Sequence, residues 1–126
     1  MGTPYSISGT FNFVPDIGLA PTPVPLTFAG VFDQEESFKI DIGAAGDVDV
    51  PLVAVPAAGA KLYLIKLDAG EDVEPILVKR NGSVTGGDEI SAGGFILVSN
   101  PTPDTGTTSL LITAASACTV RIWALG

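Results

Sequence analysis

The side chains that most often perform catalysis are scarce in this sequence. It contains no His, which removes the commonest general base and the commonest metal ligand. Its single cysteine, Cys118, follows Ala117 on a predicted strand, a setting typical of a small buried side chain rather than a nucleophile. No Gly-x-Ser-x-Gly motif is present, and the Gly-rich stretch 82–87 has no Walker lysine and opens no helix. We therefore expect no enzymatic activity and no cofactor.

Carboxylates are the remaining groups that could do chemistry, and they gather in the stretches 33–36 and 68–74. Clustered carboxylates can bind Ca²⁺. A carboxylate pair held about 5–10 Å apart can hydrolyse a glycosidic bond. Neither stretch matches an EF-hand loop, and nothing in the sequence fixes such a pair. Because both stretches fall in predicted turns, we interpret them as solvated turns and predict no metal site.

The charge balance narrows the possible partners. Six Lys and Arg against 14 Asp and Glu give a net charge of −8. Binding to nucleic acid or to an anionic membrane surface needs clustered cations, which are absent here, so we expect neither partner. No run of about 20 apolar residues is present, and the first residues lack the pattern of a signal peptide, so export by the usual route is not expected. The mean hydropathy of +0.45 favours apolar surface that is covered by the fold or by another chain.

The elements that must position these residues are strands. Apolar and polar residues alternate along much of the chain, and no window shows the spacing of an amphipathic helix. Asn81-Gly82 predicts a type I′ turn that joins the strand before it to a short strand at 83–85. We predict an all-β fold, an antiparallel β-sandwich with jelly-roll topology favoured over a closed barrel. The expected strands are 5–8, 10–14, 38–42, 48–50, 52–55, 62–67, 75–79, 83–85, 95–98, 110–113 and 119–125, with loops at 43–47, 57–59, 86–94 and 100–106.

The first thirty residues differ from the rest. Four prolines within residues 15–25 predict extended, polyproline-like chain, yet the segment also carries large apolar side chains. We predict two parts: 1–30, an extended N-terminal arm with the first strand, and 31–126, the sandwich domain. The apolar segment either crosses its own sandwich or packs on a neighbouring subunit. The predicted interface residues are Pro15, Ile17, Leu19, Pro21, Pro23, Val24, Pro25, Leu26 and Phe28.

Two aromatic residues in the second half have two possible roles. Phe95 and Trp123 lie in predicted strands, so we expect both in the core. An exposed Trp123 would instead stack on a sugar or anchor an interface.

The residues of the chain resemble those of small virion proteins of tailed bacteriophages. The resemblance rests on the Pro-rich apolar N-terminal segment, on Gly-, Ala-, Thr- and Val-rich strands with few charges, and on the acidic balance. The last strands, 107–113 and 119–126, resemble the closing hairpin of many phage structural β-domains. The resemblance implies a capsid decoration or accessory tail protein, a homodimer or homotrimer that binds the major capsid or tail protein. It also implies assembly in the host cytoplasm and a place in the virion.

Two other functions remain open at this stage. A tail-fibre or baseplate module would bind a cell-surface glycan through the loops 86–94 and 100–106. Both loops lack aromatic residues apart from Phe95 at a boundary, which favours the decoration protein. A scaffold domain of a bacterial assembly unrelated to phage is the third possibility.

Overall fold

The fold consists of strands throughout the part of the chain that is described. A computed structural model describes residues 2–13, 22–32, 34–53, 55–83, 86–100, 103 and 105–126. These residues form ten strands and no helix, which confirms the predicted all-β class. The strands are β1 (Thr3–Phe13), β2 (Thr22–Phe32), β3 (Glu35–Ile42), β4 (Gly46–Pro51), β5 (Leu62–Leu67), β6 (Ile76–Arg80), β7 (Asp88–Ile90), β8 (Phe95–Ser99), β9 (Ser109–Ala114) and β10 (Cys118–Leu125).

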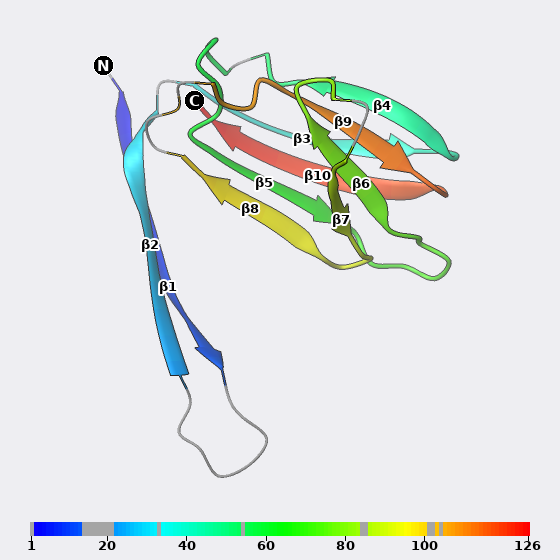
Figure 1. Cartoon of the computed structure of the whole chain (residues 1–126), viewed down its shortest axis with the longest axis horizontal. Helices are drawn as coiled ribbons and strands as arrows, with labels where there is room; N and C mark the ends of the chain where they lie inside the picture. The colour runs from blue at the N-terminus through cyan, green and yellow to red at the C-terminus, as the bar shows by residue number, and fades with distance from the viewer. Residues whose placement is uncertain are drawn as a thin grey trace.

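Eight of these strands form two antiparallel four-stranded sheets. One sheet has the order β3-β10-β5-β8 and the other β4-β9-β6-β7. The strands pair from the outside of the sequence inwards: β3 with β10, β4 with β9, β5 with β8 and β6 with β7. The chain from β3 to β10 therefore follows the path of one long hairpin whose four strand pairs are divided between two sheets. Figure 1 shows the two sheets as layers, with β6 crossing in front of β10.

Alternating side chains from both sheets fill the space between the layers. In β10 every second residue from Cys118 to Ala124 is buried, and those between are partly or fully exposed. Ile65 and Val120 of one sheet and Leu110 and Ile112 of the other have no accessible surface. Each such side chain contributes about 1.5–3 kcal/mol by leaving water. The two sheets thus share one aliphatic core, as expected from the period-2 pattern.

The turn after β6 has the predicted geometry. Asn81 and Gly82 both have positive φ, 54° and 72°, and the Ser83 amide donates to the Arg80 carbonyl at 3.1 Å. These are the features of a type I′ turn. The strand expected directly after it, 83–85, is not found at Ser83, and residues 84–85 lie outside the described residues.

Other strand boundaries also differ from the predictions. β7, which pairs with β6, lies inside the region 86–94 that is expected to be a polar loop. It forms a strand there because Ile90, the register partner of Ile76, is buried in the core together with Ile76. The expected strand 52–55 is wrong: β4 ends at Pro51, and Val53 lies in a turn with 84% of its surface exposed. The Leu52 amide donates to the Thr108 carbonyl, which extends the β4–β9 hydrogen bonding by one residue, and the chain turns at Val53.

The N-terminal residues form a separate two-stranded ribbon, β1–β2, that extends away from the two sheets (Figure 1). The expected polyproline segment is wrong for residues 22–25, which belong to β2, while 15–21 lie outside the described residues. A strand with one neighbour turns alternate N–H groups away from its partner, so Pro23 and Pro25, two residues apart, both fit the ladder. The predicted division between 1–30 and 31–126 stays a prediction.

Candidate functional site

Groups suited to metal binding are not gathered anywhere in the described ranges. No cluster of three or more His, Cys, Asp or Glu that could hold a metal ion occurs among the described residues. The part of the chain that is described also has no helix that is long and apolar enough to span a membrane. The candidate sites are therefore surfaces and hollows: a polar hollow beside β6, an apolar groove between β3 and β4, the outer face of the β3-β10-β5-β8 sheet, and the ribbon.

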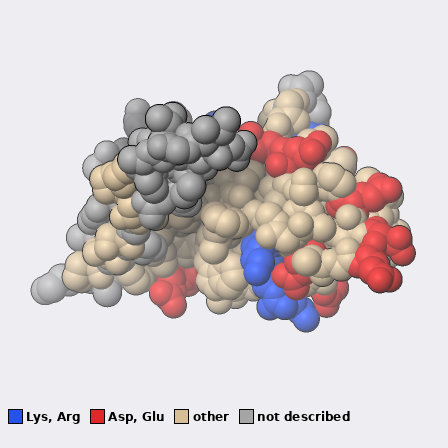
Figure 2. All heavy atoms as spheres, turned by 90° about the horizontal axis from the view of Figure 1, so that it is seen from below, with Lys and Arg blue, Asp and Glu red and all other residues tan. Residues whose placement is uncertain are grey.

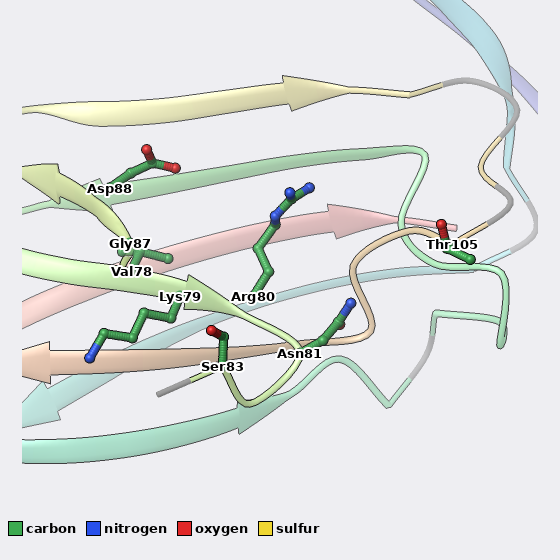
Figure 3. Close-up of a pocket in the computed structure, with 8 residues that line it drawn as sticks. All are labelled: Val78, Lys79, Arg80, Asn81, Ser83, Gly87, Asp88 and Thr105. Atoms are coloured by element: carbon green, nitrogen blue, oxygen red, sulfur yellow. The ribbon is translucent and has the colours of Figure 1, made fainter. Parts of the chain in front are cut away.

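The polar hollow lies beside the end of β6 and holds about 370 Å³. Figure 3 shows Lys79 and Arg80 extending from β6 in opposite directions, as successive strand residues must, so they do not converge on one ligand. Lys79 donates to the Thr113 hydroxyl at 3.2 Å. Asn81 donates from Nδ2 to the Gly106 carbonyl at 3.0 Å, and its Oδ1 accepts from the Thr108 amide at 2.8 Å. The polar groups of this hollow therefore hold the 106–109 segment against the turn.

The apolar groove lies where the edges of β3 and β4 open. It holds about 510 Å³, and Phe38, Ile40, Val48 and the exposed Val53 contribute to its lining. Phe38, Ile40 and Val48 also pack against the core cluster. The groove is thus an open side of the core as far as the described residues show.

The outer face of the β3-β10-β5-β8 sheet carries the second set of charged groups. The strand register places Lys39 beside Arg121, Arg121 beside Lys66, and Lys66 beside Phe95. Three of the six Lys and Arg of the chain thus form one row, here named the cation row, in a protein of net charge −8. Figure 2 shows cationic side chains gathered in one area of the face that it views, with carboxylates spread around them.

The neighbouring row of the same sheet is apolar. It consists of Trp123 of β10, Leu64 of β5 and Leu97 of β8, with Ser37 of β3 at its end. Trp123 is 43% exposed and Phe95, at the end of the cation row, is 59% exposed. The prediction that both aromatic residues lie in the core is wrong. Odd-numbered residues of β10 face outward because the core takes the even-numbered Val120 and Ile122.

A shallow hollow lies where these two rows meet at β3. It holds about 210 Å³ and is lined by Ser37, Phe38, Lys39, Arg121 and Trp123. The side chains of Lys39 and Arg121 are 52% and 44% exposed, so their charged groups reach solvent. An indole, a guanidinium and an ammonium group thus border one small hollow.

Carboxylates on the far side of the cation row fix its geometry. Arg121 donates from Nε to both carboxylate oxygens of Asp68, at 3.0 and 3.1 Å. This hydrogen bond lowers the pKa of Asp68 and raises that of Arg121. Lys39 lies 3.8 Å from Asp41, and the Thr119 hydroxyl donates to Asp41. No described residue accepts a hydrogen bond from the terminal nitrogens of Arg121, whose contacts with Asp68 are made through Nε.

The predicted interface residues fall on the ribbon and on the segment that joins its strands. Pro23, Val24, Pro25, Leu26 and Phe28 lie on β2, whereas Pro15, Ile17, Leu19 and Pro21 lie outside the described residues.

The register of the ribbon shows a pattern that the sequence analysis missed. It pairs Ile7 with Phe28 and Phe11 with Val24, and Gly9 with Leu26 between them. Direct partners share a face of a ribbon, so the register assigns these residue types to positions on one face, here named the apolar row. The other face carries Ser6, Ser8, Thr10 and Pro25, all exposed. Only the register of β1 on β2 brings the two halves of this row together.

Known proteins give no further guide. This chain matches no family model, no curated protein and no solved structure in the comparisons made. The function is therefore argued from the geometry of the chain itself.

Proposed function

We propose that this protein is a bacteriophage virion structural protein, a capsid decoration protein that stabilises the shell through contacts between its copies and the major capsid or tail protein. The observation that carries the proposal is the β1–β2 ribbon. Two strands alone are marginally stable in water, so the ribbon needs another surface to pack against. A second copy of the chain, in a homodimer or homotrimer, provides that surface.

The strand order supports a jelly-roll topology for the two sheets. A jelly roll is an eight-stranded double sheet in which a long hairpin is rolled up, and it is common in viral capsid proteins and in lectins. The pairing of β3 with β10 through to β6 with β7 has this form. Because one fold serves many functions, the topology supports the virion proposal by analogy only, and the ribbon carries it.

A charged residue introduced into the apolar row of the ribbon tests whether copies of the chain associate through it. Ile7→Asp places a carboxylate at the position paired with Phe28, and Ser8→Asp places the same charge on the exposed face one residue away. Losing the burial of one Ile costs about 2 kcal/mol per copy, so Ile7→Asp should weaken self-association about thirtyfold or more. Light scattering after size exclusion should show a smaller species for Ile7→Asp and the wild-type oligomer for Ser8→Asp.

Binding to a shell tests the second half of the proposal. The full chain should co-sediment with purified capsids that lack it, and deletion of residues 1–28 should abolish the binding. A wild-type chain that is monomeric at about 100 µM, well above the ~1 µM dissociation constant of an ordinary stable complex, and that leaves capsids bare would overturn the proposal.

A further inference from the structure

We infer that the hollow beside Trp123 is a binding site for an acidic saccharide, a chain of sugar rings that carry carboxylates. The inference goes beyond the proposed assembly function and does not rest on it, because the hollow lies on the outer face of the β3-β10-β5-β8 sheet and uses no residue of the ribbon. The site also differs from the loops 86–94 and 100–106 that the sequence suggested for a glycan.

The exposed indole supplies the first requirement of such a site. Trp123 lies on the outer face of the sheet with Leu64 and Ser37 as its register neighbours and 43% of its surface exposed. Sugar rings have apolar faces of C–H groups that pack on aromatic rings, and an aromatic side chain with one apolar face and one polar edge suits that contact.

The cation row supplies the second requirement. Successive outward residues of one strand lie roughly 7 Å apart, which is the span of one sugar ring and its substituents. Arg121 is two residues from Trp123 on β10, and Lys39 is the register partner of Arg121. A ring stacked on Trp123 would lie beside the cation row, in the hollow that Lys39 and Arg121 also line, and a carboxylate substituent there could form charge-assisted hydrogen bonds with these two side chains.

The arrangement of the carboxylates makes the site selective for an anion on this side. Asp41 and Asp68 lie beyond the cation row, away from Trp123, and hold Lys39 and Arg121 in place. Toward the other end of β3, the exposed Glu35 borders the Trp123 row and accepts hydrogen bonds from sugar hydroxyls. The cations gathered in this row favour an acidic ligand on this face by charge complementarity.

The fluorescence of Trp123 reports binding directly because it is the only Trp in the chain. The probes for the full-length protein are tetragalacturonate, the neutral maltotetraose and the acidic peptide tetraglutamate. We expect a saturable change in emission with tetragalacturonate. Two exposed charge contacts, each worth about threefold, predict about tenfold tighter binding than for maltotetraose. Added salt should weaken the binding because exposed charges are screened.

Variants assign the binding to the cation row. Lys39→Gln and Arg121→Gln should each weaken tetragalacturonate binding about threefold. Arg80→Gln removes one exposed positive charge from β6 in the other sheet and should leave the affinity unchanged. Circular dichroism and the midpoint of unfolding check that each variant is folded. If Arg121→Gln is not folded, Lys39→Gln alone tests the role of the cation row.

Three results would overturn the inference. One is the absence of a saturable emission change with tetragalacturonate. The second is equal affinity for tetraglutamate, which would mean that the face binds any acidic chain. The third is equal affinity of the Lys39→Gln and Arg80→Gln variants. None of these results bears on the oligomeric state, so failure of this inference and failure of the assembly proposal are distinguishable.

Discussion

Asn81 connects the turn after β6 to the segment before β9, and its replacement should cost more than an exposed position usually does. The side chain makes two short hydrogen bonds: Nδ2 donates to the Gly106 carbonyl at 3.0 Å and Oδ1 accepts from the Thr108 amide at 2.8 Å. The backbone adds a third contact, because the Asn81 amide donates to the Ser109 carbonyl at 2.9 Å. The residue also has φ of 54°, which Asn tolerates and most residues do not.

These terms give different expected costs for three substitutions. Two side-chain hydrogen bonds at about 1 kcal/mol each make Asn81→Gly about 2 kcal/mol less stable, since Gly accepts the positive φ. Asn81→Ala loses the same bonds and adds about 1 kcal/mol for the left-handed backbone, so it should lose about 3 kcal/mol. Asn81→Asp keeps the acceptor and loses only the donor to Gly106, which predicts a loss of about 1 kcal/mol.

Urea unfolding, followed by circular dichroism, measures the free energy of unfolding of the three variants. We expect Asn81→Asp to be the least destabilised variant and Asn81→Ala the most, with Asn81→Gly between them. The slope of the free energy of unfolding against urea concentration should be the same for all three. If Asn81→Gly is at least as destabilised as Asn81→Ala, the backbone argument is wrong. If all three lie within about 0.5 kcal/mol of the wild type, the hydrogen bonds to the 106–109 segment contribute nothing, as at ordinary surface positions.

Three further predictions concern other parts of the two sheets. Gly59→Ala should lower the free energy of unfolding by at least about 2 kcal/mol, because Gly59 has φ of 106° and a Cβ there would overlap the backbone of Gly106. The control is Gly43→Ala, where a Cβ would meet nothing within 4 Å, and it should change the free energy of unfolding by less than about 0.5 kcal/mol. Equal effects of the two substitutions would contradict the steric argument. The lowered pKa of Asp68 means that its pair with Arg121 stabilises the fold above the ordinary value of 3.8 and that this contribution is lost as the pH falls through 3.8 to the lower folded value. Asp68→Asn should therefore reduce the difference in urea midpoint between pH 7 and pH 3, whereas an unchanged difference would show that the exposed pair contributes nothing. Cys118 is buried and burial raises its pKa, so a thiol reagent should modify the native protein only after unfolding in urea; rapid labelling of the folded chain would contradict its placement.

The sequence by itself determined the class of fold and much of the core. Period-2 alternation in 38–42 and 119–125 predicts strands whose alternate residues are buried, and Ile42, Val120 and Ile122 are buried in the structure. Asn81-Gly82 predicted its turn because only residues that tolerate positive φ occupy a type I′ turn. These features depend on neighbouring residues alone, so local sequence is sufficient to predict them.

The tertiary structure alone decided which residues meet. The alternation of residues shows that Trp123 and Val120 lie on opposite faces of the sheet, but it does not show which face is covered. The position of the second sheet decides this, because it covers Val120 and leaves Trp123 exposed to solvent. Lys39, Lys66 and Arg121 are far apart in the sequence, and only the pairing of β10 with both β3 and β5 aligns them in one row. The apolar row of the ribbon depends in the same way on the register of β1 against β2, since a shift by one residue would place its two halves on opposite faces.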